Sequence, residues 1–349
     1  MHSIRRAWQR AYWALVGVWL AADAALDQPD TPAEDEERPQ FWYGGQAVIE
    51  GVMMRGQYLA AIAVRHPEGA IVTREVPLNA ALYRGRIARL PFVRGLVLLW
   101  DALGLGTRAL MWSADVAMEE EEDIDFSLQG AAGMGLVVVS LALGIGLFFV
   151  LPAAISAGIQ HVLGFESRFV ADAIEGLVKL ALLIGYIWAI GLMPDVKRLY
   201  GYHGAEHKTI NAYEDGAELT PEVTARYSLE HPRCGTAFLL TLVVLSVLIH
   251  MLTGRPESLP LLLLSRVGLI FPIAGIAYEV LRFTAAHVDH PVIRWLIKPN
   301  LALQHLTTRE PDRGMREVAI AALERVLAAE RAGQPLPEPR VSTEAVAAD

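Results

Sequence analysis

The chain has 349 residues, of which 53% are hydrophobic, and its mean hydropathy is +0.33. Both values exceed ordinary globular usage, and they indicate a membrane protein with at least two structural units. Much of the acidity behind the formal charge of -9 lies in the blocks 27–37 and 119–125, and no basic footprint for nucleic acid is present. The single cysteine, Cys234, excludes an intrachain disulfide and requires no oxidising compartment.

The N-terminal segment combines basic residues with an apolar stretch. Three arginines within the first ten residues precede an apolar run over 11–26, which is similar to the start of a signal peptide. The tryptophans of this run and Asp23 favour an interfacial helix over residues 1–26 instead. An acidic linker is predicted over residues 27–40.

Residues 41–117 are predicted to form a small cytoplasmic unit that contains β structure. Short apolar runs at 60–66 and 70–77 flank a Pro-Glu-Gly turn, which is typical of a hairpin. Residues 92–117 are apolar with interleaved charges. This pattern favours an amphipathic helix on the membrane surface over a full span.

Four apolar runs are long enough to cross a bilayer, since about 20 residues suffice for a helix. They occupy residues 130–155, 173–193, 235–252 and 259–284. The charged residues Arg266 and Glu279 fall inside the last run. The fold class predicted from these runs is an α-helical multi-pass membrane protein with about four transmembrane helices and a small N-terminal β-containing cytoplasmic unit. Its membrane region extends over 130–284 and includes a polar, His-rich loop at 195–234.

The distribution of Lys and Arg predicts the orientation of these spans. Basic residues gather before the first span, between the second and third, and after the fourth. The positive-inside rule then predicts that both termini and the His-rich loop are cytoplasmic. Residues 285–332 are predicted to be a cytoplasmic segment that closes with an amphipathic helix, and 333–349 a disordered tail.

The most informative motif of the loop is His-Gly-Ala-Glu-His at residues 203–207. On a helix, His203 and His207 project from one face and can share a metal ion. The order H-x-x-E-H is the inverted zinc-protease motif, in which the glutamate, here Glu206, handles protons. The alternative is an exposed helix in a polar loop.

Further candidate ligands lie at His231 and Cys234, beside the predicted turn residues Pro232 and Gly235. Cys234 directly precedes a span, where a helix N-terminus favours the thiolate as a ligand or a nucleophile. A small buried hydrophobe is the alternative. Nitrogen and sulfur donors predict a divalent ion, Zn²⁺ above all, with Glu206 as general base. The predicted ligands are His203, His207, His231 and Cys234.

Other polar residues are open to two interpretations. Glu50 and Arg55, in a glycine-rich strand, contact a ligand or pair with other residues. Glu279 serves a distant metal site or pairs with Arg282, Arg266 or Lys179. The polar loop 307–312 caps the last helix or touches an anionic substrate.

Four strings carry a family resemblance: GGQAVIEGVMMRG from Gly44, YHGAEHK from Tyr202, HPRCGT from His231 and LTTREPD from Leu306. They resemble the bacterial YqhQ-like family, whose domain of unknown function bears the number 1385. The resemblance covers about 42–327 and implies a multi-pass membrane protein acting as a metal-dependent enzyme. It points to the same motif residues, and the chain departs from it only at its ends.

Three functions remain in view from the sequence. The first is a membrane-embedded, metal-dependent enzyme, hydrolase-like, acting on a membrane-proximal or lipid-linked substrate at the cytoplasmic face. The second is a non-catalytic scaffold whose metal is structural and closed by four protein ligands. The third is a small transporter that uses Glu279 and Arg266 inside the bundle. The lipid bilayer is the predicted partner, nucleic acid is not, and neither the substrate nor a protein partner is defined.

Overall fold

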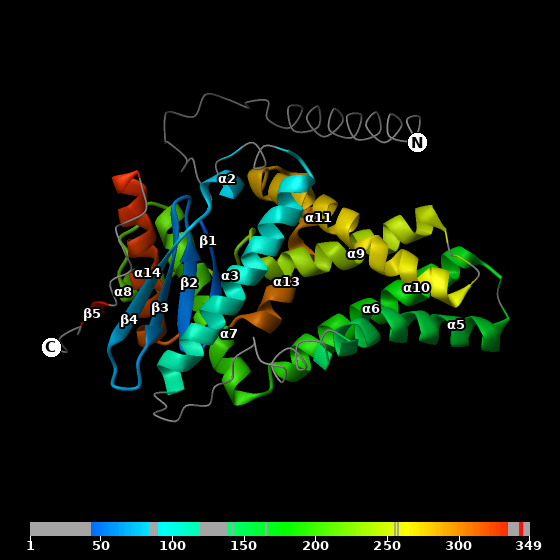
Figure 1. The fold of residues 1–349 in the computed structure, drawn as a ribbon, viewed down its shortest axis with the longest axis horizontal. Coiled ribbons are helices and arrows are strands. Elements are labelled where there is room, and N and C mark those ends of the chain that lie inside the picture. The colour runs from blue at the N-terminus through cyan, green and yellow to red at the C-terminus, as the bar shows by residue number, and fades with distance from the viewer. Residues whose placement is uncertain are drawn as a thin grey trace.

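The computed structural model describes residues 43–83, 85, 90–118, 139–140, 142–164, 166–254, 256, 258–333 and 342–344. The predicted interfacial helix and acidic linker lie outside these residues. A sheet flanked by helices occupies one end of the molecule, and long apolar helices extend from it toward the other end (Figure 1). The chain is mostly helical, as the sequence predicts.

The sheet is antiparallel, and its strands follow one another in chain order. The strands are β1 (Gly44–Val48), β2 (Gly51–Arg55), β3 (Leu59–Arg65), β4 (Ile71–Pro77) and β5 (Ser342–Glu344). The predicted hairpin is confirmed: β3 and β4 pair around Gly69, whose φ of +94° suits glycine. Strand β5, which lies in the segment predicted to be a disordered tail, pairs with β4.

Helices cover both faces of the sheet, because alternate side chains of its strands are apolar on each side. On one face, Val48 and Ile62 pack with Leu105 and Ala109 of helix α3 (Val93–Met118). The other face packs against two helices, α7 (Pro194–Glu214) and α14 (Arg313–Ala332). The predicted β unit is therefore completed by segments far away in sequence. The first half of the region predicted as a loop is the helix α7, whose apolar residues join this core.

Four helical segments are long and apolar enough to cross a membrane, in agreement with the predicted spans. They are Ala142–Leu163, which includes the π-helix η2 (Gly146–Val150) and α5 (Leu151–Leu163), then α6 (Arg168–Ile190), α9 (Gly235–Thr253), and Pro260–Ala286. The last segment comprises α10 (Leu259–Gly268) and α11 (Ile270–Ala286). Residues 130–138 of the first predicted span lie outside the described part of the chain.

Short helices return the chain from α11 to the sheet. After α12 (Pro291–Leu296), α13 (Lys298–Thr307) packs its Leu303 with Leu183 and Leu240 of the long apolar helices. Asp312 then caps α14, since its Oδ1 accepts a hydrogen bond from Met315 N at 2.8 Å. Two further short helices, α2 (Ala80–Tyr83) and α8 (Pro221–Thr224), connect neighbouring elements.

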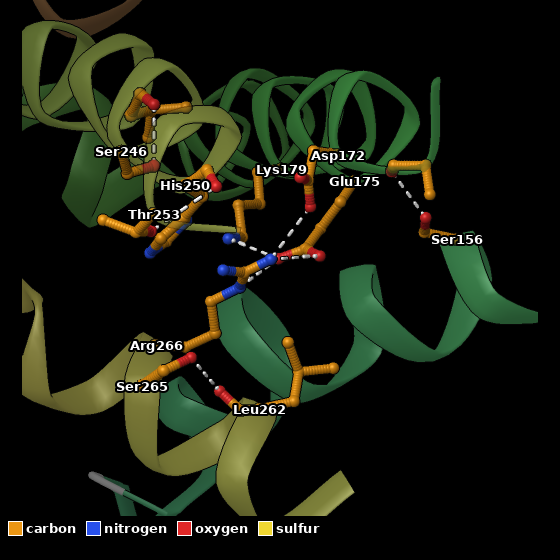
Figure 2. Close-up of polar contacts among 12 residues, drawn as sticks. Ser156, Asp172, Glu175, Lys179, Ser246, His250, Thr253, Leu262, Ser265 and Arg266 are labelled. Carbon is orange, nitrogen blue, oxygen red and sulfur yellow. Dashed lines mark hydrogen bonds and ion pairs between the residues drawn. The ribbon is translucent and has the colours of Figure 1, made fainter. Parts of the chain in front are cut away.

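A buried ionic cluster lies among the apolar helices (Figure 2). The guanidinium of Arg266 on α10 donates to Glu175 and to Asp172 of α6, both at 3.1 Å. Lys179 Nζ donates to Glu175 Oε1 at 2.8 Å. All four side chains are buried, and their two positive and two negative charges balance. Arg266 therefore pairs within this cluster, and it is not the partner of Glu279 that the sequence left open.

Candidate metal centre

Helix α7 carries the histidine motif, and its glycines allow close packing around it. Pro194 opens the helix, and the chain leaves it through a turn at Gly216, which has φ +72°. Gly204 lies against the carbonyl oxygen of Arg309, so a side chain there would collide with backbone. The backbone N–H of Arg309 donates to Tyr200 O at 2.9 Å. This contact brings the segment that follows α13 directly onto the histidine-bearing helix.

Three of the predicted ligands come together. One donor atom from each of His203, His207 and Cys234 lies within 4.8 Å of the others. His203 Nε2 is 3.2 Å from Cys234 Sγ, and the ring centroids of His203 and His207 are 4.4 Å apart. Cys234 occupies the N-cap of α9, so the first turn of an apolar helix positions its thiol. This spacing fits donors around one ion with bonds of about 2.0–2.3 Å.

Backbone carbonyls fix the orientation of both imidazoles. Nδ1 of His203 lies 2.8 Å from Thr307 O, and Nδ1 of His207 lies 2.5 Å from Leu229 O. Because Nδ1 must donate to a carbonyl, each Nε2 is left as the atom with a free lone pair. Nε2 of His207 is buried and has no hydrogen-bond partner. Histidines that bind metals show this arrangement, so these residues fit a metal ion.

His231 is close to the group but does not belong to it. Its ring centroid is 5.5 Å from that of His207, while its Nε2 faces Arg233 at 3.1 Å and Glu214 at 3.7 Å. Burial lowers the pKa of His231 to about 4, so the ring is neutral at physiological pH. Gln304 holds the backbone of His231 through two hydrogen bonds of 2.8 Å. His231 thus belongs to the turn that presents Cys234, and its role as a ligand stays a prediction.

Glu206 lies on α7 between the two histidines and meets strand β1. A Cβ atom at Gly45 would lie 2.9 Å from the Glu206 carboxylate, so the glycine allows the strand to approach it. The carboxylate is buried, and its Oε2 has no hydrogen-bond partner. Burial raises the pKa of Glu206 to about 7, an effect that His203 partly opposes. A carboxyl group in this state can both take and return a proton near neutral pH.

Comparison with known proteins identifies the family. Residues 90–329 match the model of a family described as "Protein of unknown function (DUF1385)". The chain is also 33% identical over 295 residues to the uncharacterized protein YqhQ of Bacillus subtilis (strain 168), which covers 82% of this chain and 92% of that relative. The chain belongs to the DUF1385 family. No solved structure matches it.

In this DUF1385 chain, the other polar candidates engage in pairs. Glu50, which has φ +51°, forms a two-point ion pair with Arg198 and accepts from Tyr202 OH at 3.2 Å. Arg55 lies over the ring of Tyr83, with 6.0 Å from Cζ to the centroid. These contacts favour the interpretation of Glu50 and Arg55 as structural residues.

Glu279 and the polar loop are also accounted for by contacts within the chain. Both oxygens of Glu279 accept from Arg94 of α3, and one accepts from Phe92 N at 3.0 Å. Arg94 was not among the partners expected from the sequence. The loop 307–312 supplies the Asp312 cap of α14 and the carbonyl oxygen of Thr307 that holds His203. The loop therefore contributes a backbone carbonyl oxygen to the candidate metal centre, which its side-chain pattern did not indicate.

Proposed function

We propose that this protein is a membrane-embedded, metal-dependent enzyme of the hydrolase type. The observation that carries the proposal is the group formed by His203, His207 and Cys234, whose donor atoms lie within 4.8 Å of one another. Among the described residues the group has three donors, which is the number typical of catalytic zinc sites, because a fourth position stays open for water or substrate. Its two nitrogens and one sulfur favour Zn²⁺ over Mg²⁺ or Ca²⁺.

The chain's own residues divide the chemistry among them. A bound zinc ion supplies Lewis-acid activation of water or of a substrate oxygen. His203 and His207 would hold the ion through Nε2, because their Nδ1 atoms are engaged by the carbonyl oxygens of Thr307 and Leu229. Glu206, buried beside them with one oxygen unpaired, takes the proton of the attacking water and returns it to the leaving group.

The position of Cys234 supports a substrate near the membrane. This ligand caps α9, an apolar helix long enough to cross a bilayer, so the site lies where the sheet-bearing unit meets the spans. In this proposal the site lies on the cytoplasmic face of a bacterial inner membrane, with both termini inside, an orientation that the distribution of Lys and Arg supports. A membrane-proximal or lipid-linked substrate follows from this location.

Metal content tests the proposal directly. Plasma mass spectrometry on detergent-purified protein should find about one zinc ion per chain, as a three-ligand site predicts. The variants His203→Ala and Cys234→Ser should lose this metal. The variant His161→Ala is the matched control, because this histidine is exposed on α5, and it should retain the metal. Wild-type protein that is folded yet free of metal would exclude the proposal.

A structural metal site in a scaffold protein is the second candidate. It is favoured by one observation, the proximity of the His231 ring to His207. A rotation of the His231 side chain would complete a four-ligand site. Cobalt substitution separates the two candidates without knowledge of the substrate. If the site is open, azide should change the visible spectrum of the Co²⁺ protein, whereas a closed four-ligand site should not respond.

The variant Glu206→Gln completes the comparison between enzyme and scaffold. In an enzyme this change should leave the metal content intact and abolish hydrolysis, because the amide cannot accept the proton. In a scaffold it should have no specific effect beyond stability. A screen of phosphoester, amide and ester substrates in mixed micelles, run on wild type and variant side by side, supplies the readout.

A further inference from the structure

Helix α3 exposes a row of large apolar side chains along its first half. Trp100 is 80% exposed and Leu103 is 66% exposed, and Val93 at the start of the helix is 41% exposed. The opposite side of α3 already packs against the sheet and α11. Large exposed apolar patches on proteins mark contacts with a partner or with lipid.

The first turns of α3 lie against α11, which belongs to a candidate membrane span. A Cβ atom at Gly95 would come within 2.6 Å of Tyr278 Cβ, so the two helices approach closely at a small residue. Glu279, which binds Arg94, lies seven residues before the end of α11 at Ala286, or about 10 Å at 1.5 Å per residue. The start of α3 is therefore level with residues inside the span.

The charges in this half of α3 are turned away from the exposed row. Arg94 is bound to the fully buried Glu279. Asp101 accepts a hydrogen bond from Tyr83 OH at 2.5 Å. The first exposed charge is Arg108, fifteen residues or about 22 Å beyond Val93. A helix can lie at the edge of the membrane when its charges are paired within the protein. A sequence pattern that only counts charges does not detect this pairing.

A second exposed tryptophan lies at the same end of α11. Helix α12 begins five residues after Ala286, and it exposes Val292, Trp295 and Leu296, with Trp295 69% exposed. Tryptophan is enriched where the acyl chains of a bilayer meet the headgroups. Two exposed tryptophans beside one span are typical of this zone.

We propose that residues 93–103 of α3 are embedded in the headgroup–acyl boundary of the bilayer, with Trp100 and Leu103 in contact with lipid. The second half of α3 then leaves the membrane and covers the sheet, as its course from α11 across the strands indicates (Figure 1). The occupant of the exposed row is lipid, because the row begins beside a helix of a candidate span and shares that level with the exposed Trp295. This proposal does not depend on the metal centre.

Spin labels on α3 test this arrangement in the full chain reconstituted into phosphatidylcholine and phosphatidylglycerol vesicles. Trp100→Cys and Leu103→Cys carry the label in turn, and Asp115→Cys, exposed near the far end of the helix, is the matched control. Cys234 is buried and stays in place, and labelling of the parent protein gives the background. Collision rates with oxygen, which enters the bilayer, and with a water-soluble nickel chelate report the depth of each label.

At positions 100 and 103, the ratio of oxygen to nickel collisions should exceed that at 115 several-fold. Nickel collisions at 100 equal to those at 115 would place α3 in water and overturn the proposal. Protection from both reagents would overturn it as well, since a protein partner would then cover the row. Quenching of Trp100 by brominated lipid, measured as the difference between wild type and Trp100→Phe, gives the same answer without a label.

Discussion

Two buried polar clusters lie at opposite ends of helix α9. Cys234 of the metal centre caps its start, and His250 beside the ionic cluster lies in its last turn, sixteen residues or about 24 Å away. A buried imidazole whose Nε2 has no hydrogen-bond partner lies at each end, His207 within the metal centre and His250 beside the ionic cluster. The same unpaired atom occurs in two different electrostatic settings.

The neighbours of each imidazole give it a different meaning. Around His207, a donor atom of another imidazole and the sulfur of a thiol lie within 4.8 Å, and such a set of donors fits a cation. Around His250, the cations Arg266 and Lys179 are already present and are balanced by carboxylates. An unpaired buried nitrogen therefore indicates a metal site only where further donors converge with it.

The largest expected difference between the two clusters appears when a donor is removed from the metal centre. In His207→Leu, the ion loses a nitrogen ligand while the volume of the buried side chain is roughly kept, so metal content should fall from about one per chain to near zero. The corresponding change at the other end, His250→Leu, should leave metal content unchanged. Plasma mass spectrometry measures both, and equal losses would refute the distinction between the two clusters.

The next largest effect is expected in the ionic cluster. Arg266→Met removes a fully buried cation and leaves Glu175 and Asp172 with too little positive charge, which should lower the free energy of unfolding by about 3–5 kcal/mol. Titration with denaturing detergent, followed by circular dichroism, measures this loss. Metal content of the folded fraction should remain at the wild-type level.

A matched control for this change is Arg294→Met. Arg294 and Asp289 are both largely exposed, and their ion pair at 4.0 Å should contribute only about 0–1 kcal/mol. If Arg266→Met were no more destabilising than Arg294→Met, the buried cluster would not stabilise the bundle. Its charges would then be retained for another purpose, such as the transport function that the sequence leaves open.

A smaller effect is expected from the residue that supports the metal centre from outside. Gln304 holds the turn that begins at His231 and ends at Cys234, so Gln304→Leu should weaken metal affinity by roughly 10–100-fold while the three ligands remain. Competition with a chromophoric chelator measures the affinity. Asn300→Ala, on the same helix but bonded to Thr241, is the control and should retain wild-type affinity.

The sequence predicts those features of the fold that arise from local pattern. The four apolar segments and the hairpin over β3 and β4 follow from hydrophobicity and turn residues, and the structure has both. The completion of the sheet by α7 and α14 was not predicted, because it depends on contacts between segments that are more than 100 residues apart. A polar sequence such as 195–214 resembles a loop until its partners are known.

The candidate site is predicted to a similar degree. The spacing of His203 and His207 predicts a shared face on a helix, and the structure brings Cys234, also a predicted ligand, close to both. The carbonyl oxygens of Thr307 and Leu229 could not be predicted, because every residue has such an atom and no side-chain pattern identifies the one that binds. The pairing of Glu279 with Arg94 could not be predicted for a related reason, because the two residues lie 185 positions apart.

The smallest effect on stability is expected at His250, whose unpaired nitrogen belongs to no group of metal donors among the described residues. In His250→Leu, an apolar side chain replaces a buried imidazole whose Nε2 makes no hydrogen bond, so no partner is lost and the cost of burying that nitrogen is removed. The free energy of unfolding should change by less than about 1 kcal/mol or rise. The detergent titration used for Arg266→Met measures it. A loss as large as that of Arg266→Met would mean that the imidazole has a partner, such as an ordered water, and that both ends of α9 hold a polar group in place.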